Sequence, residues 1–377
     1  MYINENVKKW ADEMWGKLDK KLSHSAQTVG DMIPYTTKDG KYCPHPCEDI
    51  TCWTNGFWGG LMWIMYAGTK NDVYRKAAEK NEELLEEAFE IYDGLHHDVG
   101  FMWLLTSGAN NLLTGNEKAV TRLRRAADFL AARFNVDGGY IRAWNGPKEE
   151  ERRRQIAIID CMMNIPLLYR ATEDSMDDRY KAIAMRHADK TMKFHVRPDG
   201  SINHIMRYDN HTGEVVCIEG GQGYDENSSW TRGQSWGLYG FTLSYIHTGK
   251  KEYLDTAKKI AHYFIAACCN DWLVRSDFRA PEEPVLYDNT AACIAACGLI
   301  ELSKLVPKYE SAMYFNAAIN ILKATEEKFA DWSQDADGIF NCGSEWYHNG
   351  KHMHIIYGDY YFAEAIYKLR DVGPLFW

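Results

Sequence analysis

Two aspartates stand where a carboxyl group could transfer a proton. Asp160 lies within the apolar run IIDCMM, and burial in such surroundings raises the pKa of a carboxyl group towards neutrality. A carboxyl group that keeps its proton at neutral pH can act as a general acid. Asp98 follows His96 and His97 and is a second candidate, with His97 as its partner or as a substrate contact. The simpler interpretation of either aspartate is that it caps a helix.

A second group of residues is suited to binding an anionic sugar. The segment SSWTRGQSWG combines Arg232 with Trp230 and Trp236. The arginine fork matches a carboxylate, and aromatic rings stack on the C–H faces of sugars. Three further candidates lie in other loops: Trp53, Trp144 and His204. Large helical cores also use aromatic residues, so structural tryptophans are the alternative.

Charge and composition exclude several classes of protein. The net charge of −10, with no long basic run, argues against nucleic acid or an anionic membrane as partner. No apolar run reaches the roughly 18 residues of a membrane span, and the first residues lack a signal-peptide core. We therefore expect a cytoplasmic protein with reduced cysteines, a monomer or a weak homo-oligomer. Cys43, His45, Cys47 and Cys52 lack the spacing of a zinc site, so we expect no metal and no other cofactor.

Helical periodicity dominates the chain, and strand signals are sparse. Six segments are apolar nearly all round, which predicts buried helices; they cover 56–67, 99–113, 158–171, 234–247, 290–305 and 360–370. Six amphipathic segments predict outer helices and cover 5–21, 72–92, 119–134, 178–194, 251–267 and 309–329. The alternation predicts one all-α domain over residues 1–377, an (α/α)6 barrel, with an open helical solenoid as the alternative. The charged run 148–154 is interpreted as a solvated loop.

The barrel would bring the candidate acids together. All inner helices of such a barrel run in one direction, so their N-termini share one rim. Asp98, Asp160 and Asp359 each lie at or just before the first turn of a predicted inner helix. We expect this rim to hold the pocket, although an aspartate at each of these positions could also serve only as a cap.

In order and spacing, six motifs resemble the unsaturated glucuronyl hydrolases of glycoside hydrolase family 88. They are WTNGFWGG, HHDVGF, IIDCMMN, SSWTRGQSWGLYGF, DNTAACIAACGL and GDYYFAEA, spread from residue 53 to the C-terminus. The resemblance implies an (α/α)6 barrel that needs no metal. It would remove 4,5-unsaturated uronic acid from the non-reducing end of lyase-generated fragments of chondroitin, hyaluronan, heparin, gellan or xanthan. It implies Asp160 and Asp98 as catalytic residues and a substrate pocket made by Trp53, His97, Trp144, His204, Gln222, Trp230, Arg232 and Trp236.

The implied reaction is hydration of a vinyl ether rather than displacement at C1. We expect protonated Asp160 to give its proton to C4, ionised Asp98 to stabilise the developing positive charge, and Arg232 to bind the uronate carboxylate. Two features depart from the family. Gly221 stands where relatives often carry a histidine, and KHMHII at 351–356 stands where relatives that favour sulfated substrates place Ser and Lys. The preference for sulfated or unsulfated disaccharides is therefore open.

Three other functions are compatible with parts of this pattern. An unsaturated rhamnogalacturonyl hydrolase shares the barrel and the chemistry but acts on pectin fragments. A sugar 2-epimerase would use paired histidines and would not consume a double bond. A non-catalytic helical toroid would bind oligosaccharide or protein and would tolerate loss of both aspartates.

Overall fold

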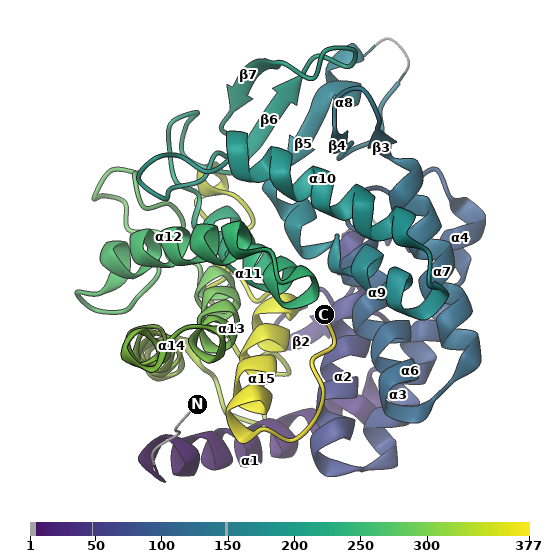
Figure 1. The fold of residues 1–377 in the computed structure, drawn as a ribbon. Coiled ribbons are helices and arrows are strands. Elements are labelled where there is room, and N and C mark those ends of the chain that lie inside the picture. Colours follow the sequence, from purple (N-terminus) through teal and green to yellow (C-terminus); the bar gives the residue numbers. More distant parts are fainter. Residues whose placement is uncertain (1–4, 47, 148–149) are drawn as a thin grey trace.

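The fold is described by a computed structural model over residues 5–46, 48–147 and 150–377 (Figure 1). Its helices form two layers. The inner layer consists of α2 (Gly56–Thr69), α5 (Val99–Trp103) with α6 (Ala109–Thr114), α9 (Pro166–Ser175), α11 (Thr231–Thr248), α13 (Asn289–Leu305) and α15 (Ile356–Arg370). The outer layer consists of α1 (Glu5–Thr28), α3 (Asp72–Leu84) with α4 (Glu87–Ile91), α7 (Glu117–Ala132), α10 (Asp178–Phe194), α12 (Lys251–Cys268) and α14 (Lys308–Phe329).

The inner helices close into a ring. Each packs against the next in chain order, and α15 then packs against α2, as Figure 1 shows for the yellow α15 beside α2 and α13. The helices α13 and α15 are buried at almost every position, whereas α7 and α10 bury only one face. This difference follows from the apolar surface of the first pair and the amphipathic pattern of the second. The closed ring is the predicted (α/α)6 barrel and excludes the open solenoid.

The N-terminal helix α1 completes the outer layer, because it packs against α15 and α3. The second inner helix is continuous but contains a π-helical turn at Leu104–Gly108 between α5 and α6. Among the described residues, none of the helices has the length and apolar character that a bilayer crossing requires. The nine cysteines in the described ranges are free thiols; Cys47, part of the candidate zinc group, lies outside those ranges.

The third inner helix begins later than predicted. Residues 158–171 were expected to be helical throughout, but the chain first forms strand β5 (Ile156–Ile158) and a 3₁₀ turn, η3 (Ile159–Met163). The regular helix α9 starts at Pro166, since proline lacks an N–H and is favoured at the first helical position. Pairing with a distant strand overrides the local helical pattern here.

That distant strand belongs to a small antiparallel sheet beside the rim. Strand β6 (Ile205–Tyr208) pairs with β5 on one side and with β7 (Val215–Glu219) on the other, with Ile158 opposite Ile205. Short hairpins join β1 (Thr36–Lys38) to β2 (Lys41–Cys43) and β3 (Phe134–Asn135) to β4 (Tyr140–Ile141). Short elements complete the described fold: helix α8 (Glu151–Gln155) and 3₁₀ turns at Trp53–Asn55 and Tyr347–Asn349.

A glycine allows the second and third inner segments to approach closely. A Cβ atom on Gly100 would lie 2.6 Å from the Cα of Asn164, a distance that side chains do not tolerate. The contact brings the start of α5, just after Asp98, against η3, which contains Asp160. Only glycine permits this approach.

Candidate active site

A cavity of about 170 Å³ opens where the first turns of several inner helices meet. It is lined by Trp53, His96, His97, Asp98, Trp144, Ile158, Asp160, Gln222 and Arg232. Trp53 precedes α2, Asp98 precedes α5, Asp160 lies in η3, and Arg232 lies in the first turn of α11. The shared direction of the inner helices therefore gathers residues that are far apart in the sequence, as expected of the barrel.

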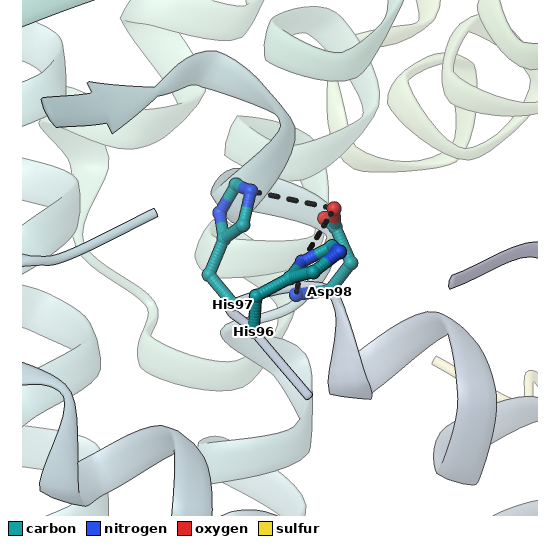
Figure 2. Close-up of side chains that lie close together, drawn as sticks. All are labelled: His96, His97 and Asp98. Carbon is teal, nitrogen blue, oxygen red and sulfur yellow. Dashed lines mark hydrogen bonds and ion pairs between the residues drawn. The ribbon is translucent and has the colours of Figure 1, made fainter. Parts of the chain in front are cut away.

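Asp98 occupies the capping position of α5 but does not cap it, because its side chain accepts no hydrogen bond from that helix. The Nδ2 of Asn164 instead donates to Asp98 Oδ1 at 2.8 Å. The Nδ1 of His96 and the Nε2 of His97 each lie 3.3 Å from Asp98 Oδ2 (Figure 2). The simple capping interpretation does not describe this aspartate.

These neighbours set the charge of Asp98. Burial by itself raises the pKa of this carboxyl group, but the charge of His97 and hydrogen bonds with His96 and His97 lower it by more. The net pKa lies well below the ordinary value for an aspartate. Asp98 is therefore an anion at neutral pH.

Asp160 has a different environment. Its side chain is 16% exposed, and Nε2 of His204 lies 3.6 Å from Asp160 Oδ2. That oxygen is buried and has no hydrogen-bond partner among the described residues. The backbone around it is held firmly, since Ile159 N–H donates to the His204 carbonyl at 3.1 Å and Asn164 Nδ2 donates to the Asp160 carbonyl at 3.1 Å. The arrangement fixes the main chain and leaves one carboxyl oxygen without a hydrogen-bond partner among the described residues.

His204 is positioned by the turn that carries Gln222. Its Nδ1 lies 3.1 Å from the Gln222 N–H and 3.3 Å from the Gly220 carbonyl, and its ring packs on Trp230 at 4.3 Å between centroids. Gly221 has a φ of +60°, and a Cβ atom on it would lie 2.2 Å from His204 Nδ1. The glycine that departs from the family pattern is therefore required by the position of His204.

Arg232 lines the cavity but already has partners. Its Nη1 donates to Asp288 Oδ2 at 3.0 Å, and its Nη2 donates to the Glu345 carbonyl at 2.6 Å. The guanidinium carbon lies 4.5 Å from the Trp230 ring centre. Gln222 Nε2 donates to the same Glu345 carbonyl at 2.6 Å. The segment around Glu345 thus holds both Arg232 and Gln222 at the cavity.

Two tryptophans predicted in the pocket lie behind it. Trp230 is 3% exposed and packs on His204 and Arg232. Trp236 is completely buried and packs against Phe101 and Tyr361. Neither lines the cavity. Trp236 follows Arg232 by four residues, about one helical turn, so it lies deeper in the barrel.

Asp359, expected at the same rim, is a structural residue. It is fully buried, and its carboxylate accepts hydrogen bonds from Ile339 N–H at 3.1 Å and Phe340 N–H at 3.2 Å. His354 Nε2 lies 2.7 Å from the same carboxylate. The position lies within α15 rather than at its first residue, so its side chain ties a loop to the helix instead of entering the cavity.

Among the described residues, one group of side chains could hold a metal ion. The ligand atoms of His96, His97 and Asp98 lie within 4.8 Å of one another. The separations of 3.3 Å between Asp98 Oδ2 and the two ring nitrogens are those of direct hydrogen-bonded contacts (Figure 2). These contacts account for the cluster without a cation, and absence of a metal stays a prediction.

Comparison with known proteins places this geometry in a family. No protein-family model matches the chain. It is 35% identical to the unsaturated glucuronyl hydrolase of Bacillus sp. strain GL1, over 93% of this chain and 98% of that protein. It is 31% identical to the unsaturated chondroitin disaccharide hydrolase of Streptococcus pneumoniae, over 100% of this chain and 95% of that protein. The chain belongs to the unsaturated glucuronyl hydrolase family.

Solved structures of family members share the fold. The crystal structure of the glucuronyl hydrolase of Streptococcus agalactiae superposes with a TM-score of 0.91 at 30% identity, covering 98% of this chain and 94% of that one. A glucuronyl hydrolase described as specific for heparin superposes with a TM-score of 0.88 at 30% identity, covering 97% of this chain and 98% of that one. This family member is therefore a glycosidase on an (α/α)6 barrel.

Several residues that build the site of this glucuronyl hydrolase were not singled out from the sequence. Asn164 stands inside the motif IIDCMMN, and its position one turn after Asp160 could have suggested a contact. Asp288 opens the motif DNTAACIAACGL, but no local signal links Asp288 or Glu345 to Arg232, because they lie 56 and 113 residues away from it. His96 was noted only as a neighbour of His97.

Proposed function

We propose that this protein removes 4,5-unsaturated uronic acid from the non-reducing end of lyase-generated glycosaminoglycan oligosaccharides. The relatives reported above are named for glucuronyl, chondroitin disaccharide or heparin substrates, which supports this substrate class over pectin fragments. The observation that carries the proposal is the cavity lined by both Asp98 and Asp160, with Asp98 held ionised and one oxygen of Asp160 without a hydrogen-bond partner among the described residues.

The substrate is a vinyl ether, in which the ring oxygen donates electron density to C4. In the proposed first step, protonated Asp160 transfers its proton to C4, and positive charge develops on C5 and the ring oxygen. Asp160 suits this step because it lines the cavity beside His204, and its Oδ2 has no hydrogen-bond partner among the described residues. Such a positioned acid contributes a factor of roughly 10² to 10⁴ in rate.

Asp98 acts as the fixed negative charge in this proposal. His96, His97 and Asn164 hold it as an anion in the wall of the same cavity. A preorganised charge in a site with little water stabilises the developing cation more than bulk solvent would.

Water then adds to C5, with Asp98 or the newly ionised Asp160 accepting its proton. The product is a hemiketal, whose C5–O5 bond breaks to give a C5 ketone and a hydroxyl on C1. Collapse of that hemiacetal releases the aglycone as an alcohol. Because attack does not occur at C1, the carboxylate spacing that separates retaining from inverting glycosidases does not apply.

Arg232, Gln222, Trp53 and Trp144 bind the substrate in this proposal. They line the cavity, and Arg232 keeps a positive charge there although Asp288 offsets part of it. His204 and Trp230 support the wall from behind through their contact with each other. Trp236 contributes through packing of the barrel core rather than through contact with sugar.

Residues 1–377 act as one catalytic domain in this proposal. Contact between α15 and α2 supports it, because the last helix completes the ring begun by the first inner helix. The cytoplasmic location and the monomeric or weakly oligomeric state stay predictions.

A substrate panel tests the proposed function. The conjugated double bond of the unsaturated uronate absorbs in the ultraviolet, so its loss reports turnover directly. We expect unsaturated chondroitin disaccharide to be consumed much faster than unsaturated rhamnogalacturonan disaccharide. Preference for the pectin fragment would replace the proposed substrate class, and loss of neither absorbance would reject the enzyme reaction.

A further inference from the structure

A second, larger cavity lies next to the one described above. Its volume is about 560 Å³, and Trp144 lines both cavities. The wall consists of Tyr92, Asp93, Phe129, Ala132, Arg133, Arg142, Trp144, Asn145, Gly146, Pro147, Arg153 and Arg154. The two cavities therefore adjoin at this side chain.

The wall of this cavity is strongly basic although the chain is acidic. Four arginines and one aspartate line it, whereas the whole chain carries a net charge of −10. Arg153 and Arg154 come from the charged run 148–154, which was interpreted as a solvated loop. In the described part of that run, these two side chains instead belong to a concave site.

Arg133 is the buried member of the group. It is 8% exposed and donates to the Arg142 carbonyl at 2.9 Å, to the Ala143 carbonyl at 2.7 Å and to Asn145 Oδ1 at 2.8 Å. These partners are neutral. Burial and the neighbouring charge of Arg142 lower the pKa of Arg133 to about 9. Two positive charges are therefore held close together in this wall.

One nitrogen of the Arg142 side chain lacks a hydrogen-bond partner among the described residues. This nitrogen, Nε, is buried, a costly arrangement for a charged donor. Arg153 differs, because it pairs with Glu150 at 3.2 Å and lies over the Trp144 ring at 5.4 Å. An anion in this cavity would offset the positive charges of Arg133 and Arg142, which both line its wall.

We propose that this arginine-lined cavity binds an anionic group on one of the sugars that follow the unsaturated uronate. The inference rests on the proposed function, because the anionic group belongs to the proposed substrate, and the two cavities share Trp144 as a lining residue. The group is a sulfate ester or a second uronate carboxylate, since both present the paired oxygens that an arginine fork matches. The cavity selects charged aglycones over neutral ones.

Substitution of Arg142 tests the proposal. Two ratios of kcat/KM are measured. The first compares a sulfated with an unsulfated unsaturated chondroitin disaccharide. The second compares an unsulfated tetrasaccharide, which carries a second uronate, with the unsulfated disaccharide. We expect Arg142→Gln to lower one of these ratios about tenfold, mainly through KM, which corresponds to about 1.4 kcal/mol. A fall in the first ratio identifies sulfate as the bound group, and a fall in the second identifies carboxylate.

Arg179→Gln is the matched control. Arg179 is an exposed arginine on α10 that pairs with Asp177, and both ratios should stay at the wild-type values. Thermal melting of each variant separates a loss of selectivity from a loss of fold, and Arg154→Gln provides a second variant if Arg142→Gln does not fold.

Failure of this inference differs from failure of the proposed function. If the wild type consumes the unsulfated disaccharide but both ratios remain within twofold in the Arg142 and Arg154 variants, the anion site does not exist. If the wild type consumes none of the unsaturated substrates, the proposed function fails first.

Discussion

The side-chain amide of Asn164 donates to Asp98 Oδ1 at 2.8 Å and so ties the third inner segment of the barrel to the second. The side-chain Oδ1 of Asn164 accepts a hydrogen bond from the Phe101 N–H at 3.0 Å, and Nδ2 also donates to the Asp160 backbone carbonyl. One buried residue therefore contacts the segments that carry both candidate catalytic carboxyl groups.

We predict that Asn164→Ala lowers both activity and stability. The Phe101 N–H would keep only its bond to the Asp98 carbonyl, and the buried Asp98 carboxylate would lose a hydrogen-bond partner, a loss that costs about 1–3 kcal/mol. Asp98 would lose a donor that favours its charged form, so its pKa should rise. We expect kcat to fall at least roughly tenfold, measured by absorbance decay beside thermal melting. Wild-type kcat in a folded variant would contradict this role.

Asp160→Asn should abolish turnover without unfolding the protein. Asparagine is nearly isosteric but cannot deliver the proton, so we expect kcat to fall roughly 10³-fold, within the range for a general acid. Asp174→Asn is a control on α9, because that carboxylate pairs with Arg170 away from the cavity. Near-normal turnover by Asp160→Asn would reject the assignment of the proton donor.

The lowered pKa of Asp98 predicts a loss of stability in acid. The folded state keeps Asp98 ionised, whereas the unfolded chain protonates it near the ordinary value of about 3.9. This contribution is therefore complete above about pH 5 and declines as the pH falls towards the folded-state pKa. Melting temperatures of wild type and Asp98→Asn between pH 7 and pH 3, as an approximate range around that value, should converge in acid. A constant difference would show that Asp98 does not carry the effect.

Gly221→Ala should damage the site more than a comparable change elsewhere. An alanine at a positive φ costs about 1–2 kcal/mol by itself, and the new Cβ would also collide with His204 Nδ1. Gly115→Ala is the control, because Gly115 has a φ of +74° with open space around it. We expect both variants to lose stability and only Gly221→Ala to lose roughly tenfold or more in kcat, since displacement of His204 changes the surroundings of Asp160. Equal activity of the two variants would contradict this.

Removal of metal ions should leave activity unchanged. Asp98 Oδ2 already contacts His96 and His97, and the proposed steps use only protons and water. Dialysis against a chelator, followed by the absorbance assay with and without added zinc, measures this directly. Activity that falls on dialysis and returns with zinc would make the His96, His97 and Asp98 group a metal centre.

Periodicity determined much of the architecture, because the apolar pattern of a helix records on which sides it is buried. The predicted helices 178–194 and 290–305 correspond to α10 (Asp178–Phe194) and α13 (Asn289–Leu305). The same local rule failed at Ile156–Ile158, where three apolar residues pair with β6. A short apolar run is compatible with helix or strand, and only the distant partner decides between them.

The sequence by itself determined which residue types could act and that inner-helix N-termini would share one rim. Tertiary structure decided which of those residues meet there: Asp98 and Asp160 line one cavity, whereas Trp236 and Asp359 are buried elsewhere. It also placed Arg133 and Arg142 in the wall of one cavity with Trp144. The physical reason is that helix propensity and capping act over a few residues, while the distances between carboxylates, arginines and their partners depend on how the whole ring closes.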